Sequence, residues 1–295
     1  MKILFVFIDG LGIGAKNVLY NPLTVANIPV LDNLLTGKTG TVVAADACLG
    51  IKGIPQSATG QTALFTGINA ARMMGRHISG FPGPTLRKLL AEKNILLRLK
   101  KLGRTVAFAN AYTEDYVEKV RAGKAKGSVT TVSLLTAKIP FRFISQIKEG
   151  KAVYQDFSNT LLREKGYSVP IFAPEQAAKN LTTLAKEHDF TLYEYFQTDR
   201  AGHQQDLSKA VNLLQELDRF IGSIVKYLDL SHTLLIISSD HGNIEDLSIK
   251  THTKNPVPVI LLGKAGQLIK NKIREITDII PAILSLYKNE LKEGI

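Results

Sequence analysis

Two kinds of hydrophobic pattern alternate along the chain. Short apolar runs rich in β-branched and aromatic residues predict strands at residues 2–8, 39–45, 105–110, 191–198, 233–239 and 257–262. Stretches with apolar positions every three or four residues predict helices at residues 61–66, 86–102, 174–186, 207–228 and 276–287. Strands separated by helices indicate a three-layer α/β fold, in which a mostly parallel sheet has helices on both faces.

Residues 112–168 interrupt this alternation. They contain a Gly- and Lys-rich run at 121–127, a Thr- and Ser-rich run at 128–135 that is typical of a strand, and scattered aromatic residues. We expect them to form a small cap inserted into a metal-binding catalytic core made of residues 1–111 and 169–295. The alternative is that the segment adds one more layer to the core.

The apolar run at residues 3–8 is interrupted by Asp9. It is shorter than the apolar region of a signal peptide, and much shorter than a membrane-spanning helix of about 20 residues. We interpret it as a buried first strand and expect a cytoplasmic protein with no membrane partner. The single cysteine, Cys48, excludes an intramolecular disulfide and a Cys-rich zinc site.

The charge balance is basic, with 37 Lys and Arg against 26 Asp and Glu, a formal net charge of +11. The densest basic segment, residues 87–104, interleaves its cations with leucines and so predicts an amphipathic helix with a solvated basic face. It lacks the interleaved aromatic residues that are typical of single-strand binding. The charge therefore fits a small anionic substrate, with a nucleic-acid surface as the alternative.

Aspartate and histidine gather where the predicted strands end or begin, and ligands of open parallel sheets bind beyond the carboxyl ends of the strands. Half of the six histidines lie there; the set is Asp9, Asp199, His203, Asp240, His241 and His252. Taken singly, an Asp after a strand is usually a turn or cap residue, and a lone His is usually structural. Together they form a carboxylate and imidazole set that suits Zn²⁺ or Mn²⁺ rather than Ca²⁺.

The spacing of these residues favours two ions. Asp199 and His203 are four residues apart and share one face if the turn between them is helical. Asp240 and His241 are adjacent, so they can serve two neighbouring ions. Two ions about 4 Å apart can bind the attacking and leaving oxygens of a phosphoryl transfer.

A candidate nucleophile lies in residues 53–64. Ser57 comes shortly before the predicted helix 61–66, where unpaired backbone N–H groups and the helix dipole favour an anion. The alternative is that Ser57 only caps that helix. Thr59 is a second candidate by the same reasoning.

Together these motifs resemble those of the alkaline-phosphatase superfamily. The resemblance is carried by Asp9-Gly10, Ser57, Asp199 with His203, Asp240-His241-Gly242-Asn243 and the run HTKNPVP at 252–258. The last two are specific to the branch of cofactor-independent phosphoglycerate mutase and phosphopentomutase. The matching motifs lie in residues 1–70 and 190–290.

The resemblance implies two divalent metal ions, Mn²⁺ or Zn²⁺, and a phosphoserine intermediate at Ser57. It implies one ion held by Asp199, His203 and His252, and a second held by Asp9, Asp240 and His241 with Ser57 in contact. Gln61 stands where the mutases usually carry a histidine.

The expected cap is much shorter than the Arg-rich inserted domain of the phosphoglycerate mutases, and none of that domain's substrate residues can be placed on it. A mutase must hold its intermediate and exclude water, so a short cap favours a phosphatase acting on a small phosphorylated metabolite. The alternatives are a phosphomutase and, in another class, a non-catalytic basic protein that binds nucleic acid. The candidate substrate residues are Arg72, Arg76, His77, Asp156 and Lys254, with Asn159 and Arg163 as further cap residues.

Overall fold

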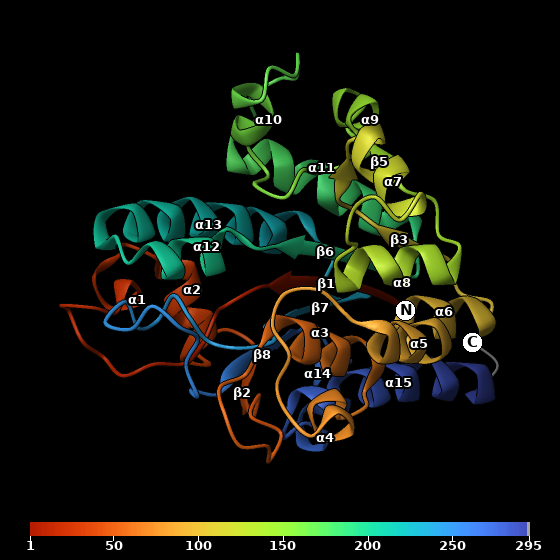
Figure 1. Ribbon diagram of the computed structural model, residues 1–295, viewed down its shortest axis with the longest axis horizontal. Coiled ribbons are helices and arrows are strands. Elements are labelled where there is room, and N and C mark those ends of the chain that lie inside the picture. The colour runs from red at the N-terminus through yellow and green to blue at the C-terminus, as the bar shows by residue number, and fades with distance from the viewer. Residues whose placement is uncertain (294–295) are drawn as a thin grey trace.

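A six-stranded sheet lies at the centre of the computed structural model, which describes residues 1–293 (Figure 1). The strand order is β2-β8-β7-β1-β6-β3. The bounds are β1 (Lys2–Ile8), β2 (Thr41–Ala45), β3 (Val106–Phe108), β6 (Phe190–Tyr195), β7 (Thr233–Ser238) and β8 (Val257–Leu262). β1 is parallel to β6 and β7, and β3 is parallel to β6, whereas β8 is antiparallel to β7 and β2. The predicted mostly parallel α/β sheet is confirmed, with an antiparallel edge.

Helices cover both faces of this sheet and make three layers (Figure 1). One face carries α3 (Ser57–Thr66), α5 (Pro84–Lys93) and α15 (Ile279–Glu293), and the other carries α2 (Pro29–Leu35), α11 (Pro174–Glu187) and α13 (Leu207–Tyr227). Each face buries its own apolar cluster, because the residues of the central strands alternate between the two faces. The shorter helices are α1 (Pro22–Val25), α4 (Ala70–Met74), α6 (Ile95–Lys101), α12 (Gln197–Gln204), α14 (Gly266–Ile269) and two 3₁₀ turns at Lys270–Lys272 and Ile276–Asp278.

The segment expected to form a cap divides into two parts. β4 (Ala111–Tyr112), β5 (Arg142–Phe143), α7 (Glu114–Arg121), α9 (Ile144–Lys148) and α10 (Thr160–Glu164) lie on the side of the molecule that is uppermost in Figure 1. Ile147 and Leu162 belong to a separate small buried cluster there. In contrast, α8 (Val129–Ala137) packs against α5 and α6, and its Val129 and Leu134 belong to a main core cluster. The division into a core and a cap at 112–168 stays a prediction.

Two sequence predictions within this architecture are wrong. The helix at 86–102 is two helices, because Asn94 has an extended backbone and caps α6 by accepting from the N–H of Leu97 at 3.0 Å. The run at 128–135 is not a strand but α8, where the hydroxyl of Ser133 donates to the carbonyl of Val129 at 2.8 Å. Burial of this helix against its neighbours overrides the β-propensity of its residues.

The expected strand 191–198 ends earlier, at Tyr195, because the helix α12 already begins at Gln197. This shift places Asp199 inside a helix rather than after a strand. None of the helices in residues 1–293 combines the length and the apolar character that crossing a lipid bilayer requires.

Candidate active site

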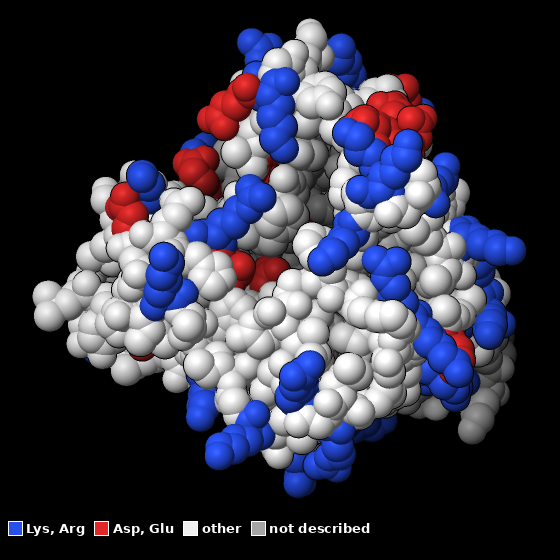
Figure 2. All heavy atoms as spheres, in the orientation of Figure 1, with Lys and Arg blue, Asp and Glu red and all other residues white. Residues whose placement is uncertain are grey.

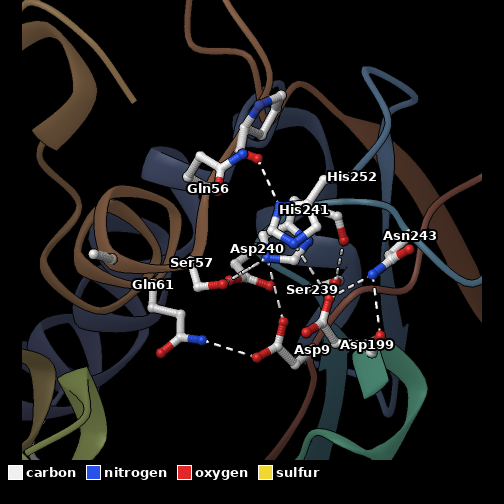
Figure 3. Close-up of polar contacts among 12 residues, drawn as sticks. Asp9, Gln56, Ser57, Gln61, Asp199, Ser239, Asp240, His241, Asn243 and His252 are labelled. Atoms are coloured by element: carbon white, nitrogen blue, oxygen red, sulfur yellow. Dashed lines mark hydrogen bonds and ion pairs between the residues drawn. The ribbon is translucent and has the colours of Figure 1, made fainter. Parts of the chain in front are cut away.

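Three neighbouring strands bring the candidate metal ligands to one edge of the sheet (Figure 3). Asp9 follows β1, and its N–H donates to the carbonyl of Tyr195 at 2.9 Å, which extends the pairing of β1 with β6. Asp240 and His241 follow β7, the other neighbour of β1. Asp199 lies in α12, directly after β6. The side chains therefore converge because the carboxyl ends of parallel strands meet at one edge.

Asp9, Asp240 and His241 form one buried group, whose potential ligand atoms all lie within 4.8 Å of one another. Nε2 of His241 is 3.4 Å from Oδ1 of Asp9 and 3.3 Å from Oδ2 of Asp240. Gln61 donates from Nε2 to Oδ2 of Asp9 at 3.0 Å. The residue that stands where the mutases usually carry a histidine thus contacts this group directly.

Asp199, His241 and His252 form an adjoining group, also within 4.8 Å. Nε2 of His252 is 3.4 Å from Oδ1 of Asp199, and Nε2 of His203 is 3.2 Å from Nε2 of His252. The turn between Asp199 and His203 is helical, and their side chains lie 3.5 Å apart on one face of α12. His241 takes part in both groups, and its ring stacks on that of His252 with centroids 3.7 Å apart.

Burial and mutual repulsion shape the electrostatics of this cluster. Burial, together with the negative charge of Asp240, holds the pKa of Asp9 well above its usual value. Burial and the charge of Asp199 raise the pKa of Asp240 to about 7. Burial and the neighbouring His252 lower the pKa of His241 to about 3, which makes this imidazole neutral at pH 7. The hydrogen bond with Asp199 raises the pKa of His252 against the effect of burial, so this imidazole balances the charge of Asp199. Asp9 and Asp240 contact only the neutral His241, and their carboxyls have no cationic partner of this kind.

Several buried polar atoms of the cluster have no hydrogen-bond partner among the side chains of residues 1–290 or the backbone of residues 1–293. They are Oδ1 of Asp9, both carboxylate oxygens of Asp240 and Nδ1 of His241. Buried polar atoms are almost always satisfied, so such a group needs another partner. Divalent cations with carboxylate and imidazole ligands satisfy atoms of this kind, and the donor set fits two of them.

Ser57 lies beside this cluster, at the start of α3. Its Oγ is 3.0 Å from Nε2 of His241. The N-cap of α3 is Gln56, so the alternative that Ser57 serves as the helix cap is wrong. The Thr59 hydroxyl is occupied differently: it donates to the carbonyl of Gln56 at 3.2 Å and accepts from the N–H of Ile78 at 3.1 Å.

A cavity of about 500 Å³ opens next to Ser57 and Asp9. Its walls come from β6, α7, α8 and the loops around them. Figure 2 shows the molecular surface hollowed in its middle, with acidic atoms inside the hollow and basic side chains around it. A cavity of this size suits a small metabolite.

None of the five candidate substrate residues is among those that line this cavity. Arg76 and His77 line a second cavity of about 490 Å³, together with Lys52. Both carboxylate oxygens of Asp156 accept backbone N–H groups of its own loop, at 3.0 Å and 2.8 Å. Lys254 is exposed.

Arg72 is also exposed. Its guanidinium lies beside Gly50, where an added Cβ would be 3.7 Å from it. Asn159 donates to the carbonyl of Pro170, and Arg163 to that of Val169, so both stabilise the loop that follows α10. The substrate-binding assignments of all seven residues stay predictions.

The sequence reasoning missed two buried carboxylates near the site. Glu245 accepts hydrogen bonds from the N–H groups of Gly12 at 3.0 Å and Asn243 at 2.8 Å. It directly follows the Asp-His-Gly-Asn-Ile run, a signal that could have identified it. Glu194 lines the cavity, and its position inside an otherwise apolar, buried strand is the signal that could have singled it out.

Comparison with known proteins gives one family and several relatives. A family model described as the metalloenzyme superfamily matches residues 1–288. The 2,3-bisphosphoglycerate-independent phosphoglycerate mutase of Thermococcus kodakarensis is 28% identical over 138 residues, covering 42% of this chain and 33% of that protein. The mutase of the same name from Agrobacterium fabrum is 31% identical over 188 residues, covering 58% of this chain and 36% of that protein. The chain thus spans about a third of the length of these relatives.

Solved structures share the fold. A protein from Pyrococcus horikoshii superposes with a TM-score of 0.63 at 17% identity, covering 97% of this chain and 96% of that one. Alkaline phosphatase from the Antarctic bacterium TAB5 gives a TM-score of 0.56 at 12% identity, covering 97% and 98%. Together with the family model, these matches confirm the resemblance drawn from the motifs.

Proposed function

The chain belongs to the metalloenzyme superfamily, and from this premise and its site geometry we propose that it is a metal-dependent phosphatase of small phosphorylated metabolites. The single observation that carries the proposal is the position of Ser57. Its hydroxyl lies 3.0 Å from His241, at the edge of the unbalanced carboxylate cluster and on the wall of the cavity. A nucleophile, an anion-binding helix start and a metal-ligand set thus meet at one point.

In this proposal Asp9, Asp240, His241 and Ser57 hold one divalent ion, and Asp199, His203 and His252 hold the other. The ions are Mn²⁺ or Zn²⁺, which suit carboxylate and imidazole ligands. When bound, they neutralise the carboxylates, lower the pKa of the serine hydroxyl and stabilise charge on the phosphoryl oxygens.

The side chains of the protein position the reaction. Oγ of Ser57 loses its proton to solvent and attacks phosphorus, while the bond to the ester oxygen breaks and that oxygen leaves with the electron pair and takes a proton from water to form the alcohol. The phosphoryl group is carried on Ser57 until a water molecule attacks phosphorus, which releases phosphate and returns the serine hydroxyl. Nε2 of His241 faces both Oγ of Ser57 and the carboxylates of Asp9 and Asp240, so Oγ lies beside the proposed ligands of this ion. The N–H groups of Ser57 and Ala58, which donate to no acceptor within residues 1–293, face an anion at the start of α3.

Phosphomutase activity is the second candidate function, and the sequence match to phosphoglycerate mutases supports it. In that case the phosphoryl group returns from Ser57 to another hydroxyl of the same substrate instead of passing to water. Scoring phosphate release and isomerisation separately, over a set of phosphorylated metabolites with Mn²⁺, Zn²⁺ or Mg²⁺, separates the two activities.

The direct test is the Ser57→Ala variant, assayed with 4-nitrophenyl phosphate in Mn²⁺ or Zn²⁺. We expect its turnover to fall to background, and ³²P from labelled substrate to be trapped on Ser57 of the wild type and not on the variant. Thr59→Val is the matched control, because it removes the neighbouring hydroxyl, and it should retain activity. Undiminished turnover in Ser57→Ala would refute the assignment.

A further inference from the structure

The cavity beside Ser57 holds a buried carboxylate that the proposed phosphoryl transfer does not use. Glu194, near the end of β6, is only 7% exposed and lines the cavity. Its Oε2 accepts a hydrogen bond from the hydroxyl of Thr130 in α8 at 2.7 Å. Its Oε1 accepts no hydrogen bond from the side chains described, those of residues 1–290, or from the backbone of 1–293, and no cationic side chain among residues 1–290 pairs with it. One carboxylate oxygen therefore remains available to a molecule in the cavity.

The surroundings of Glu194 suit a small organic group rather than water alone. The rings of Tyr112 and Tyr116 line the cavity and are nearly parallel, 4° apart in plane with centroids at 5.8 Å. Asn110 also lines it. Aromatic walls with a few polar groups are typical of sites that bind small molecules and fix their orientation.

The cationic and the anionic side chains that line the cavity lie at different depths. Lys165 and Arg200, its two cationic lining residues, are exposed, whereas Glu194 is buried. The negative charge of Glu194 contributes to the raised pKa of Asp9, so the carboxyl lies close enough to influence the site. Ser57 and Glu194 line the same cavity, so a phosphomonoester with its phosphoryl group at Ser57 has room for its leaving group beside this carboxylate.

We propose that Glu194 selects the leaving group, by accepting a hydrogen bond from a hydroxyl or ammonium on it and by rejecting a carboxylate at that position. This inference rests on the proposed function, and it names the substrate class of the same site: phosphomonoesters of neutral or amino-bearing alcohols. It also separates this chain from its relatives, because phosphoglycerate, which their names contain, carries a carboxylate.

The energetics of burial give the reason. Burial raises the pKa of Glu194 to about 7, because only the Thr130 hydroxyl compensates its charge. With this pKa about half of the Glu194 side chains carry a charge at pH 7. A donor on the leaving group restores a partner to the charged form, whereas a second carboxylate beside the charged form adds repulsion. Hydrogen bonds to charged groups are strong enough to change affinity about 10- to 100-fold.

Glu194→Gln tests the assignment, because it keeps the size and the contact with Thr130 while removing the charge. The Mn²⁺-loaded enzyme is assayed with phosphoethanolamine (ammonium), glycerol 3-phosphate (hydroxyl), 3-phosphoglycerate (carboxylate) and 4-nitrophenyl phosphate (no donor). We expect the ratio of kcat/KM for the better of the first two to that for 4-nitrophenyl phosphate to fall about 10- to 100-fold, and the same ratio for 3-phosphoglycerate to rise. Which of the first two the wild type prefers distinguishes an ammonium from a hydroxyl.

Thr130→Val is the matched control, since it removes the hydrogen bond to Glu194 but keeps the carboxylate. A purely structural role for the pair predicts similar losses in both variants and on all four substrates, and that result would overturn the proposal. So would a wild type that prefers 3-phosphoglycerate.

A binding measurement keeps this inference separate from the proposed function. Calorimetry with the Mn²⁺-loaded Ser57→Ala protein measures phosphoethanolamine and glycerol 3-phosphate without turnover. We expect one of them to bind, and Glu194→Gln in that background to weaken it about 10- to 100-fold. If the wild type hydrolyses no phosphomonoester but this loss is seen, the proposed function fails and the selection by Glu194 stands. If neither probe binds, or if Glu194→Gln leaves the affinity unchanged, the selection fails.

Discussion

Oγ of Ser57 lies 3.0 Å from Nε2 of His241, and this contact joins the start of α3 to the loop after β7. His241 belongs to both candidate ligand groups. The proposed nucleophile therefore rests against the one imidazole that the two groups share, and the position of Ser57 depends on the same side chain as the metal centre does.

This relationship predicts that His241→Gln impairs metal binding and catalysis together. We expect the metal content after saturation to fall below the two ions proposed for the wild type, and turnover of 4-nitrophenyl phosphate to drop by more than about 100-fold, because losses of this order follow even from changes outside the ligand set. Metal analysis of purified protein and a phosphatase assay measure the two effects. His232→Gln is the matched control, since His232 is exposed and pairs only with nearby surface residues. Wild-type metal content in His241→Gln would contradict the assignment of His241 as a metal ligand.

The carboxyl cluster predicts a pH dependence of stability in the metal-free protein. The pKa values of Asp240 and Glu194 are raised to about 7, and that of Asp9 is also raised, chiefly by burial. Their unfolded values are about 4, so between about pH 4 and 7 the native state binds more protons than the unfolded state, and stability falls as pH rises. His241 acts in the opposite sense below about pH 6.5, because its pKa is lowered to about 3, but the three carboxyls outnumber it.

We therefore expect the Tm in a chelator to be lower at pH 8 than at pH 5.5, at constant ionic strength. Mn²⁺ should raise the Tm more at pH 8 than at pH 5.5, because the ion competes with protons for the same oxygens. Thermal scans with and without the ion measure both effects. A Tm of the metal-free protein that rises from pH 5.5 to pH 8 would show that ionisation of these carboxyls does not destabilise the native state.

The local pattern of the sequence was sufficient to predict the strand β1 and the meeting of Asp9, Asp240 and His241. Continuous apolar runs identify central strands, and the parallel topology then brings their ends together. Glu194 could not be assigned a role in this way, because its importance depends on a cavity that forms only when α7 and α8 pack beside β6. The same holds for α8 itself, whose Thr- and Ser-rich sequence favours a strand until tertiary burial makes it a helix.

Gly202 lies inside the helix α12, and replacing it by alanine should have the opposite effect on stability from that expected for a helical glycine. Replacing such a glycine by alanine normally stabilises a helix by about 0.5–1 kcal/mol. Here a Cβ would overlap the side-chain amide of Asn243, whose Nδ2 donates to Oδ1 of Asp199 at 2.7 Å. We expect Gly202→Ala to lower the free energy of unfolding by about 1–3 kcal/mol and to weaken metal binding through Asp199.

Denaturant unfolding and metal titration check this prediction. Gly83→Ala is the control, because Gly83 precedes α5 with an ordinary φ of −74° and a Cβ there would meet nothing within 4 Å. If Gly202→Ala proved as stable as the wild type, Asn243 would have to move without cost, and its contact with Asp199 would not constrain the site.

Glu245 is not one of the candidate metal ligands, but we expect its replacement to affect the metal centre. Its carboxylate accepts from the N–H groups of Gly12 and Asn243 at 3.0 Å and 2.8 Å, from the Thr253 hydroxyl, and from Nδ2 of Asn255 at 3.1 Å. These partners lie on the loops that follow Asp9, His241 and His252, so one buried side chain ties the three ligand loops together.

Glu245→Gln should therefore destabilise the fold and loosen the metal centre at the same time. Glutamine keeps the shape, but it offers one acceptor oxygen and an NH₂ group that would face donors, which leaves buried N–H or O–H groups without a partner. We expect the free energy of unfolding to fall by about 1–3 kcal/mol, and metal affinity to fall about 10- to 100-fold. Asp246→Asn is the matched control, because Asp246 is the next residue, is less buried and accepts only from Ser248. Equal metal affinity in Glu245→Gln and wild type would mean that the three loops hold their ligands independently, whereas a loss confined to Glu245→Gln would identify this carboxylate as the group that positions them.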